Sequence, residues 1–355
     1  MIRSTFLPLM ILAMTHAADC TAEEAPPSPA CAAPVAFPEG GEKRPWRHKR
    51  NWLFTIRQGE AAHRGQDLLT VEGQKQWLIA KFAYGPADKD LEDEDVEIWI
   101  QRYAPCGSWE LLATTRTTKD SAERTVEGVE NDGGRVFFEL PGSKRLPVGV
   151  HAVRMRVKGD FSHADFRVVI LPKGASVVVF DVDGTLTTGD PELIKELAGD
   201  LIERRHVPQM RAGGPDAARA WANKGYLVLY LTGRPDLLHS ITREWLVEKG
   251  FPPGVLHLTD TLRQAVPTDI GVAVYKTDFL RRLTDRGLTF AAAYGNAETD
   301  IRAYAAAGIA TSRTFIAGKH GGKSGTKAVA DYKTHTDDYV AVQPEAAVRA
   351  PRLSW

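Results

Sequence analysis

The sequence has little cysteine, no excess of either charge and no apolar run long enough to cross a membrane, and each shortage excludes a class of protein. The 355 residues include only three cysteines, Cys20, Cys31 and Cys106, and none of them has the close spacing of a zinc or redox motif. Lys plus Arg and Asp plus Glu both number 45, so the chain lacks the overall positive field that attracts nucleic acid. We therefore expect no zinc site and no nucleic-acid partner.

A short apolar run lies near the start of the chain. Residues 6–14 are mostly apolar, Arg3 precedes them, and Ala17 and Ala18 follow. This order is typical of a secretory signal peptide, and the run is too short to span a bilayer. We expect residues 1–18 to be a signal peptide and the mature chain to be exported, to the periplasm or the medium, without a transmembrane span. Membrane association stays open.

Export would permit a disulfide bond. One alternative is that Cys20 is lipidated, which would leave Cys31 and Cys106 to pair, although Asp19 directly before Cys20 is a poor context for lipidation. Both a lipoprotein and a soluble exported protein remain open at this stage.

Composition divides the chain, which is longer than one average domain. Residues 19–45 are rich in Pro, Ala, Gly and Glu, which predicts a linker. Residues 46–172 follow a period of two, as where Val96, Ile98 and Ile100 alternate with other side chains. About seven such segments, separated by turn signals, predict an immunoglobulin-like β-sandwich. No catalytic group stands out there, which favours a packing or binding module.

Beyond the predicted sandwich, unbroken apolar runs alternate with helical patterns. The runs occupy residues 177–180, 227–231, 255–258, 290–294 and 314–316. Such runs are typical of strands that are buried on both faces, and their alternation with helices predicts an α/β fold with a doubly wound parallel sheet over residues 173–318. Residues 319–355 are predicted to form an irregular, poorly ordered tail.

The first apolar run leads directly into the motif Asp181-Val182-Asp183-Gly184-Thr185-Leu186-Thr187. Ligands in such sheets bind beyond the carboxyl ends of the strands, and Gly184 allows the chain to turn there. A carboxylate can attack phosphorus to give an aspartyl-phosphate, and a second one can act as acid and then as base. We expect Asp181 to be the nucleophile and Asp183 the acid–base. A calcium loop is the alternative, but the following residues do not supply its further oxygen ligands.

Later positions fall where such a site needs them. Thr232, Gly233 and Arg234 end the second apolar run and are expected to hold phosphoryl oxygens of the substrate. Lys276 lies on a helix predicted over residues 274–286 and is expected to neutralise the phosphate and the nucleophile.

Two further oxygen-bearing residues, Asn296 and Asp300, follow the fourth apolar run. Mg²⁺ takes oxygen ligands and usually keeps several waters. We expect a Mg²⁺ cofactor held by Asp181, the Asp183 carbonyl, and Asn296 or Asp300.

The four-part pattern resembles the haloacid dehalogenase (HAD) superfamily. Residues 181–187, 230–235 and 293–296 are similar to the C-terminal domain of the lipin phosphatidate phosphatases. They are more similar to that of the membrane-associated phosphatidylinositol transfer proteins of the retinal degeneration B type, in which a β-sandwich also precedes the HAD domain. The resemblance covers roughly residues 77–318, and no lipid-transfer domain is recognisable. Those transfer proteins have lost the first aspartate and are thought to bind phosphatidic acid without cleaving it, whereas this chain keeps Asp181.

Three functions follow as hypotheses. The first is an exported Mg²⁺-dependent phosphatase for phosphatidic acid or a related phosphomonoester, as the resemblance to lipins implies. The second is a lipid-binding module without catalysis, and the third is a phosphatase for small soluble phosphoesters.

The spacing between the motifs leaves little room for a cap domain, which predicts an open site. Five basic residues lie in the first gap or beside the second motif, and we expect Arg211 and Arg234 in particular to bind substrate or anionic headgroups. The five are Arg204, Arg205, His206, Arg211 and Arg234.

Overall fold

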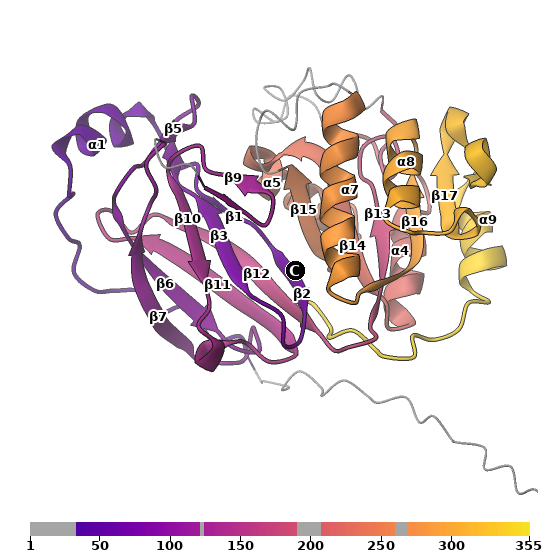
Figure 1. Cartoon of the computed structure of the whole chain (residues 1–355), viewed down its shortest axis with the longest axis horizontal. Helices are drawn as coiled ribbons and strands as arrows, with labels where there is room; N and C mark the ends of the chain where they lie inside the picture. Colours follow the sequence, from indigo (N-terminus) through magenta and orange to yellow (C-terminus); the bar gives the residue numbers. More distant parts are fainter. Residues whose placement is uncertain (1–32, 121–123, 190–206, 260–268) are drawn as a thin grey trace, which may run out of the picture.

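The computed structural model describes residues 33–120, 124–189, 207–259 and 269–355, with the side chains of residues 269 and 270 also excluded. They form two domains that pack side by side, a β-sandwich and an α/β domain (Figure 1). None of the helices in these ranges combines the length and the apolar character that a membrane crossing requires.

The first domain consists of two packed sheets. One has the strand order β1-β3-β10 and the other β2-β12-β11-β6-β7. A buried core that includes Ile98, Val153 and Phe166 fills the space between them. The strands are β1 (Arg64–Gly65), β2 (Leu68–Val71), β3 (Trp77–Lys81), β6 (Asp95–Gln101), β7 (Trp109–Arg116), β10 (Arg135–Glu139), β11 (Gly149–Val157) and β12 (His163–Leu171). The prediction of a β-sandwich is confirmed.

This domain also contains short helices and strands. They are α1 (Lys49–Phe54), η1 (Ile56–Gln58), β4 (Ala83–Tyr84), β5 (Lys89–Asp90), β8 (Thr125–Val126), β9 (Val129–Glu130) and η2 (Gly142–Lys144).

The described part of the predicted linker lies against the sandwich. The ring of Phe37 packs edge-on against Trp99 and Trp109, with centroids 5.3 and 5.2 Å apart. The Arg44 N–H donates to the Lys158 carbonyl at 2.9 Å. The prediction of a linker is therefore wrong for residues 33–45, because aromatic packing and backbone hydrogen bonds attach them to the domain. Cys106 forms a disulfide bond, and its partner lies outside the described residues.

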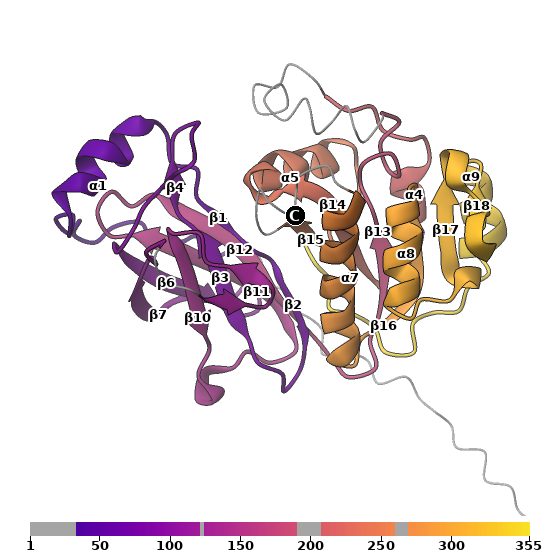
Figure 2. The same cartoon turned by 45° about the horizontal axis from the view of Figure 1, so that its top comes forward.

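The second domain is built on a six-stranded parallel sheet with the order β15-β14-β13-β16-β17-β18. Helices α7 and α8 cover one face, and α4 and α5 cover the other (Figures 1 and 2). The strand order reverses between β13 and β16, and such a reversal opens a crevice at the carboxyl ends of the strands. The predicted parallel α/β architecture is confirmed.

The elements of this domain follow in chain order. They are β13 (Ser176–Phe180), α4 (Gly214–Asn223), β14 (Leu227–Pro235), η3 (Asp236–Leu238), α5 (His239–Glu248), β15 (Val255–Thr259), α7 (Asp269–Asp285), β16 (Thr289–Gly295), α8 (Glu298–Ala306), η4 (Thr311–Arg313), β17 (Thr314–Ala317), η5 (Gly318–His320), η6 (Lys323–Gly325), β18 (Lys327–Val329), α9 (Tyr332–His335) and η7 (Thr336–Val340).

Residues 319–355 form an ordered part of this domain. Strand β18 adds to the sheet beside β17, and Tyr332 and Val340 are fully buried in the core. The indole of the last residue, Trp355, donates to the Phe251 carbonyl at 2.8 Å. The prediction of a poorly ordered tail is wrong, because buried apolar residues downstream of the Gly- and Lys-rich stretch hold the segment in place. Residues 341–355 nevertheless contain no helix or strand, as predicted for an irregular segment.

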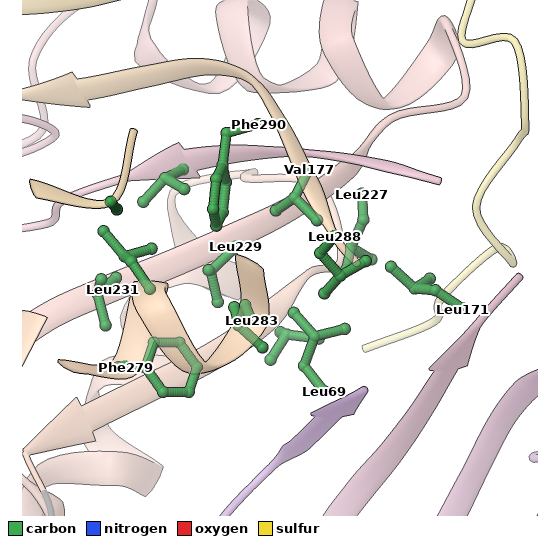
Figure 3. Packing of buried hydrophobic residues seen from close by; sticks show 14 of the residues in the cluster. Leu69, Leu171, Val177, Leu227, Leu229, Leu231, Phe279, Leu283, Leu288 and Phe290 are labelled. Carbon is green, nitrogen blue, oxygen red and sulfur yellow. The ribbon is translucent and has the colours of Figure 1, made fainter. Parts of the chain in front are cut away.

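The two domains share one hydrophobic core. Leu69 and Leu171 of the sandwich pack with Val177, Leu227 and Leu283 of the α/β domain (Figure 3). Charged groups add to this contact, since the Arg243 guanidinium on α5 donates to both oxygens of the buried Asp67 at 3.0 and 2.8 Å. The β-sandwich and the α/β domain are therefore packed together as one unit.

Candidate active site

Asp181 lies where the central strand β13 ends. Its N–H donates to the Tyr294 carbonyl at 2.9 Å, so the backbone is fixed one residue beyond the strand. Gly184 follows with φ +76°, and a Cβ there would lie 2.1 Å from the Asn296 amide nitrogen. Only glycine fits this turn, because the turn brings the motif against the carboxyl end of β16.

The Asp181 carboxylate is 3% exposed and accepts two hydrogen bonds. Lys276 Nζ donates to Oδ1 at 2.6 Å, and Thr185 Oγ1 donates to Oδ2 at 2.8 Å. Burial raises the pKa of Asp181, and the ammonium of Lys276 works against this shift. The Asp181 carboxylate is therefore held in a fixed position, and its Oδ1 is hydrogen-bonded to the buried Lys276 ammonium.

Lys276 is placed on α7 between two carboxylates. It is 3% exposed and donates to Asp181 Oδ1 at 2.6 Å and to Asp300 Oδ1 at 2.7 Å. Burial alone would lower the pKa of Lys276, but the carboxylates of Asp181 and Asp300 raise it overall. The predicted proximity of Lys276 to Asp181 is thus present in the structure.

Asp300 supports the site from behind. Its Oδ2 accepts from the N–H groups of Asn296 and Ala297 at 2.9 and 3.1 Å, and its Oδ1 accepts from Lys276. Both oxygens are therefore engaged, and the side chain is 1% exposed. The structure places Asp300 as a cap of α8 that positions Lys276, which differs from the predicted role as a metal ligand.

Asp183 is held by the second motif. Arg234 donates from Nε and Nη2 to its carboxylate, with a shortest distance of 2.7 Å, and Thr232 Oγ1 donates to Oδ2 at 3.1 Å. Arg234 is 2% exposed, and its Nη1 donates to Thr242 at 3.0 Å. The predicted headgroup contact of Arg234 is wrong, because every face of this guanidinium is turned into the protein.

Arg211 contacts the loop that carries the aspartates. Its guanidinium donates to the carbonyls of Gly184 and Thr185 at 2.9 and 3.2 Å, so it holds this loop in place. Gly233 lies against α7, where an added Cβ would be 3.0 Å from Val272 Cγ1. Both residues shape the site, and the substrate binding predicted for them stays a prediction.

Three of the five basic residues predicted to meet headgroups, Arg204, Arg205 and His206, lie outside the described residues, as do parts of both gaps between the motifs. The prediction of an open site therefore remains a prediction.

Oxygen atoms converge beside Asp181. The Asn296 amide is half-buried, and its outer atom lies 3.2 Å from Asp181 Oδ2 and 3.0 Å from the Asp183 carbonyl oxygen. With nitrogen in that position the amide donates to both; with oxygen there, three oxygens face one another. In the described ranges no group of three or more His, Cys, Asp or Glu residues could hold a metal. Any cation here would need the carbonyl and the amide as well as Asp181.

Two further residues belong to the site. Thr185 is part of the motif, and its hydroxyl, four residues after Asp181, reaches that carboxylate across a tight loop. Tyr332 donates to the Thr185 carbonyl at 3.3 Å from the segment predicted to be a tail, and no local signal marks it.

Two cavities of about 30 Å³ each lie between the domains, away from Asp181. One is lined by Arg64, Lys81 and Arg135.

Both domains have counterparts among known proteins. A family model described as the LNS2 domain of PITM 1-3 matches residues 178–318, and one described as the β-sandwich domain of PITM 1-3 matches residues 61–170. The chain is similar to membrane-associated phosphatidylinositol transfer proteins. It is 32% identical over 292 residues to "Protein retinal degeneration B" of Drosophila melanogaster and 33% identical over 285 residues to human membrane-associated phosphatidylinositol transfer protein 2.

These alignments cover 81% and 80% of the chain but 21% and 19% of the relatives, so the chain spans about a fifth of their length. Each alignment is longer than either domain, so it includes both domains in the same order. The name of the human relative refers to a lipid and to a membrane, and neither relative is a lipin phosphatase.

Proposed function

We propose that this chain is a Mg²⁺-dependent phosphomonoesterase of the HAD type, which forms an aspartyl-phosphate on Asp181 and acts on a lipid phosphomonoester such as phosphatidic acid. The observation that carries this proposal is the placement of Asp181, a buried carboxylate that lies 2.6 Å from the Lys276 ammonium at the switch point of a parallel sheet. Perturbed, charge-paired carboxylates in such crevices are typical of catalytic sites.

The donor set beside Asp181 fits Mg²⁺. Asp181 Oδ2, the Asp183 carbonyl and the Asn296 amide oxygen would hold the ion, with waters completing its shell. The Asn296 amide would have to rotate for this, because its nitrogen is the atom that satisfies hydrogen bonds to Asp181 and Asp183. When bound, the ion would neutralise charge on the phosphoryl group. Asp300 is excluded from this set because Lys276 and two backbone N–H groups already occupy its oxygens.

The residues of the chain account for the remaining chemistry. Asp181 Oδ attacks phosphorus and the bond to the leaving oxygen breaks, while Lys276 stays beside the nucleophile. Asp183 gives a proton to the leaving alcohol and then takes one from the water that hydrolyses the acyl phosphate. Arg234 and Thr232 must release Asp183 during this cycle, because both donate to its carboxylate in the present geometry.

The hydrogen bonds from Arg234 to the Asp183 carboxylate favour a second candidate function. A carboxylate bound by a guanidinium through several hydrogen bonds is well positioned but poorly placed to exchange protons. If Asp183 does not leave Arg234, the same pocket would bind a phosphomonoester lipid without cleaving it. The relatives that are named membrane-associated phosphatidylinositol transfer proteins are compatible with this second function, because their name describes lipid transfer.

Phosphate release distinguishes the two candidates. The full chain would be assayed with Mg²⁺ on vesicles containing phosphatidic acid and on a soluble phosphomonoester, beside the Asp181→Asn variant and an EDTA-treated sample. If the proposal holds, the wild type releases phosphate with Mg²⁺, and neither the Asp181→Asn variant nor the EDTA-treated sample does. Vesicle binding that depends on phosphatidic acid, without release of phosphate, would establish the binding function instead, and release from the soluble ester alone would exclude a lipid substrate.

A further inference from the structure

Helix α1 buries a polar residue and exposes its apolar ones. Asn51 is 2% exposed, and its amide donates to the Glu94 carboxylate at 2.8 Å. Trp52, Leu53 and Phe54 are 49%, 43% and 65% exposed. A helix that packs on a soluble domain normally turns its apolar side inward, so this arrangement is inverted.

No other exposed apolar group in the described part of the chain resembles this one. The remaining large exposed hydrophobic residues there are aliphatic and are not adjacent in the sequence. They are Val35, Leu111, Val207, Val247, Val274 and Val342. Single exposed residues need no explanation, whereas three consecutive exposed apolar residues, two of them aromatic, indicate a contact surface.

The exposure does not result from a loose helix. The N–H groups of Arg47 and His48 donate to the two oxygens of Glu94 at 3.0 and 3.1 Å. At the other end, Thr55 Oγ1 donates to the Asp90 carbonyl at 3.3 Å. The sandwich therefore fixes α1 from its polar side and holds the apolar side outward.

Basic residues flank the apolar side. Lys49 and Arg57 are exposed and make no ion pair within the described residues, and the Arg57 guanidinium lies 5.4 Å from the centroid of the Trp52 ring. Arg50 is also exposed, but it pairs with Glu92 at 3.0 Å. The unpaired positive charge thus lies next to the aromatic residues, and the acidic residues lie beneath the helix.

Helix α1 and the candidate active site lie at the same end of the molecule. Figures 1 and 2 show α1 level with the carboxyl ends of the parallel strands in both views. The contacts agree, because Arg64 joins Asp88, near α1, to Asp236, which directly follows β14.

We propose that Trp52, Leu53 and Phe54, flanked by Lys49 and Arg57, insert into the surface of an anionic lipid bilayer. Aromatic rings with neighbouring basic residues suit the headgroup level of such a membrane. Insertion of these residues turns the carboxyl ends of the parallel strands in the α/β domain toward the bilayer. This contact does not require the proposed phosphatase activity, although it would bring a lipid substrate to Asp181.

Vesicle flotation of the full chain tests the contact. Vesicles of phosphatidylcholine alone and of phosphatidylcholine mixed with phosphatidylglycerol carry no phosphomonoester, so they do not engage the candidate site. The wild type is expected to prefer the anionic vesicles. Trp52→Gln/Phe54→Gln should weaken binding at least about tenfold, and Lys49→Gln/Arg57→Gln about fivefold per charge. The control Leu111→Gln/Val342→Gln, which removes exposed apolar residues elsewhere, should bind as the wild type does.

Equal flotation of the wild type and the Trp52→Gln/Phe54→Gln variant would overturn the proposal, as would a wild type that floats with neither vesicle. A wild-type dimer that this variant converts to a monomer, without vesicle binding, would show that the surface is a subunit interface instead. Phosphate release from a soluble ester separates this proposal from the phosphatase. Release without vesicle binding contradicts only the membrane contact, and vesicle binding without release contradicts only the enzyme.

Discussion

At the scale of single residues, the site depends on charges that compensate one another out of contact with water. Lys276 is buried between Asp181 and Asp300, and Arg234 is buried against Asp183. A buried ion pair adds little net stability, but removing one partner leaves an uncompensated charge in the protein interior. Substitution of one partner of such a pair should therefore lower the stability of the fold, whatever its effect on catalysis.

Lys276→Met should destabilise the fold by about 3–5 kcal/mol, because two buried carboxylates would lose their shared cation. Urea unfolding at neutral pH would measure this change. The double variant Lys276→Met/Asp300→Asn, which removes one of the carboxylates, should recover part of the loss. Equal stability of the wild type and Lys276→Met would show that the cluster is solvated.

Arg234→Gln should reduce phosphate release from vesicles and from a soluble ester by the same factor, because Arg234 contacts Asp183 inside the protein and not the membrane. The wild type and the variant would be compared by kcat on both substrates. A loss confined to vesicles would contradict the buried placement of Arg234.

The positions of Asp181, Thr232, Asn296 and Lys276 were predictable at this scale. The first three follow strands and the last lies on a helix, and the apolar pattern reveals all of these elements. The contacts of Asp300, Arg211 and Arg234 depend on partners that are set by tertiary packing, and a charged residue beside a motif looks the same in sequence whether it faces solvent or a buried partner.

At the scale of elements, α5 connects the second motif to the sandwich. The helix begins at His239, directly after η3, and Arg243 on it binds Asp67 of the sandwich. Burial, with Arg243 nearby, lowers the pKa of His239 from 6.5 to about 4. A neutral imidazole is thus part of the interface between the domains.

This histidine makes stability depend on pH. Because the folded-state pKa is depressed, the contribution of His239 is fully present above about pH 6.5 and is lost as the pH falls toward 4. The free energy of unfolding should fall by up to about 3 kcal/mol from this group over that range. In urea titrations, His239→Gln should show a shallower decline. Parallel declines for the wild type and the variant would show that His239 is not protonated on unfolding.

Elements with strong periodicity were predicted, and weakly patterned segments were not. The period-two strands and the apolar parallel strands show which faces are buried. Phe37 and Tyr332 lie in stretches rich in Pro, Gly or polar residues, where a single buried ring leaves no periodic signal. Both segments are ordered because the ring packs against residues that are distant in sequence.

At the scale of the whole molecule, one hydrophobic core crosses the boundary between the domains. Leu69 and Leu171 of the sandwich are 2% and 0% exposed because strands and helix α7 of the α/β domain cover them. The change of pattern near residue 173 suggests where to divide the chain, but an apolar residue does not reveal which domain it packs against.

The shared core predicts that the chain unfolds as one unit. Leu171→Ala should cost about 2–5 kcal/mol and lower the stability of both domains together, because the cavity lies in their common core. Tryptophan fluorescence and far-ultraviolet circular dichroism in urea should give coincident transitions. Two separated transitions, with only the sandwich affected, would contradict the shared core.

The central claim is that Asp181 is a nucleophile, and trapping the phosphorylated protein tests it most directly. The full chain would be mixed with Mg²⁺ and phosphatidic acid vesicles, quenched in acid during turnover and analysed by peptide mass spectrometry. We predict one phosphoryl group on Asp181, absent from Asp181→Asn and from samples without Mg²⁺. Steady phosphate release with no phosphoryl group on Asp181, or release that persists in Asp181→Asn, would contradict the account.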